Sequence, residues 1–213
     1  MKEFLRGMVN KTHMTKRLIL CLLGVCMIGI GISWFNIVGW GADACSAFGL
    51  AIADKLNISF GNYLAMFNII LFVILFWKGK NQIGIGTVLN MFLVGYVCDF
   101  MTWIREQLWP DFAFPNFGMR LVVMILTSFI FVFGVALYMM LDLGTAPYDA
   151  LAFVIFDAQK KLPFRVVRIL WDASFALLAI ALGGKIGLVT VLMVLSVGPA
   201  ASAVGKKLEK YLS

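Results

Sequence analysis

Asn68 and Asp172 are polar side chains that fall near the middle of long apolar runs, and Arg168 precedes Asp172 in the same run. Arg168 and Asp172 are four residues apart, so a helix places them on the same face, one turn from each other. A charge near the centre of a membrane costs about 2.5–3.5 kcal/mol on insertion scales, so it needs a partner or a purpose. Three interpretations are open: an internal ion pair that holds the bundle together, a midplane site for a substrate or a proton, or charged side chains that snorkel to the membrane surface.

A second polar group lies in the segment GTAPYD, residues 144–149. Here Thr145 can cap a helix, Pro147 is tolerated in the first turn, and Asp149 is favourable near the positive end. Free N–H groups at such a helix start favour an anion. Because Asp149 is itself an anion, we expect it to cap its own helix or to face a cation or proton. Asn90 can either form a hydrogen bond between helices or bind a ligand. The candidate substrate-binding residues are therefore Asn68, Asn90, Thr145, Asp149, Arg168 and Asp172.

Other chemistries find no support in the sequence. No apolar run offers a hydrolase nucleophile with a base at usable spacing, and no glycine-rich phosphate loop is present. The four cysteines form no CxxC pair, and the single histidine, His13, lies in the N-terminal tail. We therefore expect no catalytic residues, no cofactor and no metal site, and a protein that is not an enzyme.

The composition of the chain indicates that membrane-spanning helices position these polar residues. Of the 213 residues, 62% are hydrophobic and only 14% are charged, which exceeds what a soluble domain can bury. Each nearly uncharged run is long enough, as a helix, to cross a hydrocarbon core of about 30 Å. The chain is thus expected to be an all-α membrane protein with six spans, at 18–38, 59–77, 82–103, 120–141, 164–182 and 186–204.

The chain also repeats itself. Residues 41–54 align with 144–157, and 83–95 align with 186–198. We expect a polytopic helical bundle of two structural repeats, each made of three transmembrane helices and one short, partly inserted helix. The expected divisions are a cytoplasmic basic tail (1–17), a first membrane repeat (18–103), an interfacial linker (104–118), a second membrane repeat (119–205) and a basic tail (206–213).

The number of crossings decides the symmetry of the halves. If the short helices at 41–54 and 144–157 do not cross, there are six crossings and the repeats are inverted; if they cross, there are eight and the repeats are parallel. The positive-inside rule does not choose, but the length of about 14 residues favours six. The net charge of +7 gathers in both tails, which is typical of cytoplasmic ends and argues against nucleic-acid binding.

Nearly the whole chain, from about 18 to 205, resembles the YczE/YyaS-like family of bacterial integral membrane proteins, which is related to the YitT group. Gly144, Pro147 and Asp149 resemble its Gly-x-x-Pro-Trp-Asp pattern, with Tyr148 in place of Trp. The glycine-rich stretches IGIGTVLNMFLVGYVCDF and GGKIGLVTVLMVLSVGP are also similar. The first copy, GADACS, has Ala44 and Ser46 in place of the Pro and Asp, and its Asp43 can cap the short helix that follows. The resemblance implies a multi-pass protein of the bacterial cytoplasmic (inner) membrane, and it implies little about activity.

Duplicated halves with partial helices are typical of secondary transporters, whose half-helix N-termini point at a central site. The leading hypothesis is a small-molecule carrier or channel, for an organic anion or an amphiphile, with its site at the repeat interface. The alternative is a non-transporting accessory subunit that supports a partner enzyme or ABC module. The expected partners are the lipid bilayer and an unidentified small molecule. A homodimer is left open, and both termini are expected in the cytoplasm.

Overall fold

A computed structural model describes residues 14–159 and 161–195, and all regular structure in those ranges is helical. The α-helices follow the predicted runs closely. They are α2 (Met14–Val38), α3 (Ala44–Leu56), α4 (Phe60–Lys78), α5 (Ile85–Leu108), α6 (Phe117–Met140), α7 (Pro147–Gln159) and α8 (Phe164–Ala181), with a 3-10 turn η1 (Lys80–Gln82) before α5. Residues 188–195 are also helical. The remainder of the predicted run at 186–204 lies outside the described residues.

Among the described helices, α2, α4, α5 and α6 are long and apolar enough to cross a membrane. Their outward surfaces carry large apolar side chains, of which Trp77 on α4 is 80% exposed and Phe129 on α6 is 69% exposed. Such surfaces suit contact with lipid. The predicted run at 164–182 is confirmed as a helix, α8, but it carries three charged residues, Arg165, Arg168 and Asp172, and is not among these four helices. The chain is therefore a helical membrane protein.

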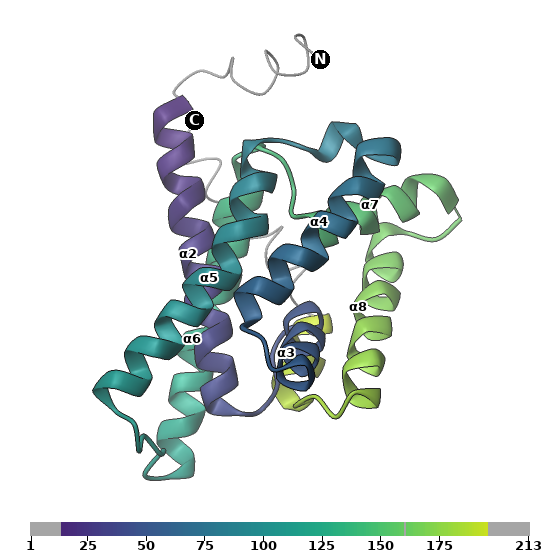
Figure 1. Cartoon of the computed structure of the whole chain (residues 1–213). Helices are drawn as coiled ribbons and strands as arrows, with labels where there is room; N and C mark the ends of the chain where they lie inside the picture. The colour runs from purple at the N-terminus through teal and green to yellow at the C-terminus, as the bar shows by residue number, and fades with distance from the viewer. Residues whose placement is uncertain (1–13, 160, 196–213) are drawn as a thin grey trace.

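Three helix pairs join the two halves of the chain: α2 with α6, α3 with α8, and α4 with α7 (Figure 1). Within the first half, α5 contacts both α2 and α4. α2 and α6 run antiparallel, because Gly24 approaches the backbone around Gly134 while Gly31, further along α2, approaches Phe131. Glycines at these positions let the two helices lie close together.

The short helices α3 and α7 have 13 residues each and lie toward opposite ends of the bundle (Figure 1). The N-terminus of α3 is capped by Asp43, whose carboxylate accepts the Ser46 N–H at 3.2 Å, as the sequence predicted. The predicted cap of the other helix is wrong. The Thr145 hydroxyl instead donates to Gln82 Oε1 at 3.1 Å, ahead of a helix that begins at Pro147.

The backbone entering each short helix is tied to the first turn of a helix of the other half. The Gly86 N–H donates to Leu143 O at 2.7 Å, and the Val189 N–H donates to Trp40 O at 3.1 Å. Gly144 has φ +102° and lies against the backbone of Gly84. A side chain there would be both strained and obstructed, which explains the glycine that starts the GTAPYD segment.

The interfacial linker is shorter than predicted. α5 continues to Leu108 and α6 starts at Phe117, so the non-helical connection is 109–116 rather than 104–118. Asn116 caps α6 by accepting the Met119 N–H at 2.8 Å. The ring of Phe112 packs edge-on against Trp34 of α2, with centroids 6.2 Å apart. This contact holds the connection against the bundle.

Candidate functional site

A cavity of about 720 Å³ lies between the two halves. It is lined from the first half by α2, α4, α5 and the start of α3, and from the second by α6, α7, α8 and residues 193–195. Its size is within the usual range for small-molecule sites, about 300–1,000 Å³. The aromatic side chains of its wall are Phe131, Tyr138, Tyr148, Phe153 and Phe164. The wall is otherwise largely aliphatic, so its few polar groups are conspicuous.

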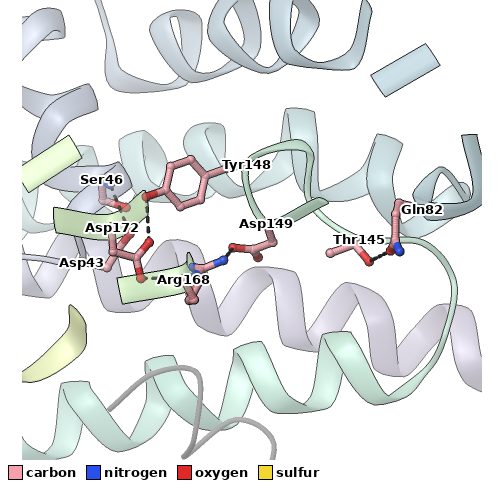
Figure 2. Close-up of polar contacts among 8 residues, drawn as sticks. All are labelled: Asp43, Ser46, Gln82, Thr145, Tyr148, Asp149, Arg168 and Asp172. Carbon is pink, nitrogen blue, oxygen red and sulfur yellow. Dashed lines mark hydrogen bonds and ion pairs between the residues drawn. The ribbon is translucent and has the colours of Figure 1, made fainter. Parts of the chain in front are cut away.

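Arg168 on α8 joins two carboxylates on the wall of this cavity (Figure 2). Its Nε donates to Asp172 Oδ2 at 3.0 Å, and one terminal nitrogen donates to Asp149 Oδ1 at 2.5 Å. The exposed fractions of the three side chains are 17% for Arg168, 18% for Asp149 and 8% for Asp172. The predicted pairing of Arg168 with Asp172 is confirmed, but the cluster also includes Asp149 from α7.

Tyr148 adds a third connection from α7 to α8. Its hydroxyl donates to Asp172 Oδ1 at 2.8 Å, so both oxygens of that carboxylate are bound. Its ring also faces the Arg168 guanidinium, with the carbon at 5.3 Å from the ring centroid. Tyr148 is 6% exposed and packs edge-on against Phe175. The start of α7 is therefore fastened to the middle of α8 by charge, hydrogen bonding and ring contact.

Two other groups on the cavity wall have unused hydrogen-bonding capacity. Asp43 Oδ2 caps α3, but its buried Oδ1 has no hydrogen-bond partner among the described residues. Tyr138 on α6 is also buried, at 1% exposed, and its hydroxyl has no hydrogen-bond partner among the described residues. Buried polar atoms of this kind are few in proteins and call for an explanation, such as a ligand or a water molecule.

The remaining predicted site residues divide into two groups. Asn68 and Asn90 both line the cavity; they are 3% and 8% exposed, and Asn68 Nδ2 donates to Met91 O at 3.4 Å. Thr145 is not on the cavity wall and binds Gln82 at a distance from the Arg168 cluster (Figure 2). Five of the six predicted residues are thus brought together around one space.

Sequence reasoning did not include Asp43, Tyr138 and Tyr148 in the site. Asp43 was interpreted only as a helix cap, and Tyr148 only as a departure from a tryptophan. The adjacency of Tyr148 to Asp149 was a usable signal, because both lie in the first turn of the same helix. For Tyr138 the sequence holds no signal, since it is one aromatic residue among many in an apolar helix.

Comparison with known proteins places the chain in a family. The family of unknown function DUF6198 matches residues 15–206, which is most of the chain. The chain belongs to this family. An uncharacterized protein of Haemophilus influenzae is 31% identical over 188 residues, covering 88% of this chain and 82% of that one. The uncharacterized protein YyaS of Bacillus subtilis is 27% identical over 185 residues, covering 81% and 84%.

These relatives confirm the predicted resemblance to the YyaS-like proteins, and both are bacterial. Neither name states an activity. No solved structure matches this chain. The function of this member of the DUF6198 family must therefore be argued from its own cavity.

Proposed function

We propose that this protein is a small-molecule carrier of the bacterial inner membrane, and that its substrate occupies the cavity between the two halves. The observation that carries the proposal is the cavity itself, because both halves contribute to a space that contains a charged cluster and unpartnered polar atoms. Ionisable groups inside a membrane protein typically mark a substrate or ion path.

The contacts between the halves support an arrangement of two inverted repeats. The pairs α3 with α8 and α7 with α4 are equivalent under the sequence repeat, as are the bonds from Gly86 to Leu143 and from Val189 to Trp40. The repeat also relates α2 to α6, which are in contact and antiparallel. Antiparallel equivalents fit a pseudo-two-fold axis in the membrane plane, which is a common architecture of secondary transporters.

The two short helices fit the same picture. The first turns of α3 and α7 both contribute to the cavity wall, through Asp43 to Ser46 and through Ala146 to Asp149. In transporters with inverted repeats, substrate sites lie where such partial helices begin. Six crossings, with both termini in the cytoplasm, follow from this arrangement and from the basic tails of the chain.

Reconstitution of the purified chain alone tests the carrier proposal. Proteoliposomes are presented with a panel of radiolabelled cationic, anionic and neutral metabolites, and accumulation is compared with that in protein-free liposomes. We expect at least one solute to accumulate. We also expect accumulation to fall with Asp172→Asn and to stay unchanged with Asp99→Asn, since Asp99 lies off the cavity and caps α4 at the Gly61 N–H (2.8 Å). If no solute enters, an accessory role beside a partner protein becomes the better account.

A further inference from the structure

We infer that the cavity selects a lipophilic organic cation, with the carboxylate of Asp43 as its counter-ion. The inference rests on the proposed carrier function and names the substrate class of the same site. It departs from the organic anion that the helix N-termini suggest from sequence, because those N-termini already face carboxylates of the chain itself.

The charge of the cavity wall is the first argument. Among the described residues, the wall carries three carboxylates, Asp43, Asp149 and Asp172, and two guanidinium groups, Arg165 and Arg168. Its formal charge is therefore −1. Arg165 is exposed, whereas Arg168 is largely buried between two of the carboxylates. An anion that reached Arg168 would lie beside Asp149 and Asp172, and like charges at that range repel strongly in a low-dielectric space.

The hydrogen-bonding state of the carboxylates is the second argument. Asp172 has both oxygens bound, by Arg168 and by Tyr148. Asp149 is bound to Arg168. Asp43 has neither a basic partner among the ion pairs of the described residues nor a partner for its buried Oδ1. It is therefore the carboxylate of this wall that a ligand cation can neutralise at the smallest cost to existing bonds.

Tyr138 provides a third and independent observation. It lines the same cavity from α6, is 1% exposed, and keeps a hydroxyl without a partner in the described part of the chain. A phenolic hydroxyl can accept a hydrogen bond from an ammonium group or donate to another ligand atom. The cavity wall therefore offers a hydrogen-bonding group to a ligand in addition to its carboxylates.

The apolar part of the wall sets the other property of the ligand. Phe153 and Phe164 are stacked, with ring centroids 4.4 Å apart, and Phe131 of α6 also lines the cavity. Aromatic faces attract desolvated cations as well as apolar groups. A cavity of about 720 Å³ with such walls favours a bulky cation with apolar substituents over a small hydrated ion.

The test compares two probes of the same shape and opposite charge. Binding of radiolabelled tetraphenylphosphonium to the purified protein in detergent is measured by equilibrium dialysis, with protein-free micelles subtracted. Binding of radiolabelled tetraphenylborate is measured in a separate dialysis, because the two ions pair with each other in solution. We expect saturable binding of the phosphonium and none of the borate. The inference is overturned if the phosphonium shows no saturable binding, or if the borate binds with equal or higher affinity.

Variants then assign the counter-ion. Asp43→Asn keeps an oxygen that can cap α3, since Asn is as good a cap as Asp, and removes only the charge. We expect it to weaken phosphonium binding by about tenfold or more, as loss of one partner of a buried charge pair does. The control Asp99→Asn, which also neutralises a helix-capping carboxylate, should bind like the wild type. Equal binding by wild type and Asp43→Asn overturns the role of Asp43, and the probe comparison stands independently if that variant does not fold.

This experiment separates the two proposals. Binding in detergent does not require transport. If the phosphonium does not bind while reconstituted protein accumulates another solute, the cation inference fails and the carrier function stands. If the phosphonium binds but no solute of the panel enters proteoliposomes, the carrier function fails and the cation site stands.

Discussion

Replacing Arg168 by Gln is expected to be the most destabilising single change in the charged cluster. The substitution leaves the carboxylates of Asp149 and Asp172 without their counter-ion, although these side chains are only 18% and 8% exposed. Removal of one partner of a buried ion pair costs about 3–5 kcal/mol, because the remaining charge stays buried without compensation. The free energy of unfolding should fall by an amount in that range.

Replacing Asp172 by Asn should cost much less, since Arg168 keeps its bond to Asp149. The amide oxygen still accepts one hydrogen bond, and the Tyr148 hydroxyl can turn to accept another. We expect a loss of about 1–2 kcal/mol, close to that of one buried hydrogen-bonding group. Combining Arg168→Gln with Asp149→Asn and Asp172→Asn removes all three charges, so the triple variant should be more stable than Arg168→Gln alone.

The assay is unfolding by SDS in mixed micelles, followed by circular dichroism, with the free energy extrapolated to zero SDS fraction. Arg105→Gln is the control, because the Arg105 side chain has a similar exposed fraction, 22%, but pairs with Glu106, whose side chain is 55% exposed. An ion pair whose carboxylate is solvated contributes about 0–1 kcal/mol. The reasoning is refuted if Arg168→Gln costs no more than Asp172→Asn, or if the triple variant is as unstable as the single one.

Three further predictions concern the frame of the cavity and its orientation. In the same SDS assay, Gly144→Ala should lower the free energy of unfolding by about 1–3 kcal/mol more than Gly183→Ala does. Both glycines have positive φ, but only Gly144 lies against a neighbouring backbone. Equal losses would show that this contact does not matter for stability. Asp43→Ala should lower thermal stability by about 1 kcal/mol while Asp43→Asn has little effect, and a melting curve in which the two variants coincide would exclude capping as its structural role. In intact cells, a cysteine at the exposed position Ala113 should react with an impermeant maleimide from outside, and one at the exposed position Asn81 should react only after permeabilisation; the reverse pattern would invert the proposed topology.

Much of the fold could be predicted because it depends on local properties of the sequence. The apolar runs predicted α2, α4, α5 and α6 to within a few residues. The short helices α3 and α7, of 13 residues each, were expected at about 14 residues, although the predicted cap of α7 was wrong. The pair of Arg168 and Asp172 was predictable for the same reason, since a spacing of four on one helix leaves little choice of geometry.

The parts that could not be predicted depend on contacts between helices. The bond from Arg168 to Asp149 joins α8 to α7, and no spacing rule relates residues 19 apart. The position of Tyr138 beside the cavity depends on how α6 packs against α2 and on which of its faces is turned inward. The non-helical connection is shorter than the predicted linker because α5 continues to Leu108 and α6 already begins at Phe117.

The claim that the cavity is a transport site can be tested without knowing the substrate. Cys45 lies in the first turn of α3 and lines the cavity, whereas Cys21, Cys26 and Cys98 do not. These other three cysteines are replaced by Ala, and the reaction of Cys45 with a charged methanethiosulfonate reagent is measured in right-side-out and inside-out vesicles.

A carrier exposes its central site to each side of the membrane in turn. Cys45 should therefore react from both faces of the membrane. Ala146 also lies on the cavity wall, so a bulky side chain there should block the exchange between the two orientations and slow the reaction of Cys45 from at least one face. Reaction of Cys45 from one face only, in the unblocked protein, would contradict the claim that this cavity carries a solute across the membrane.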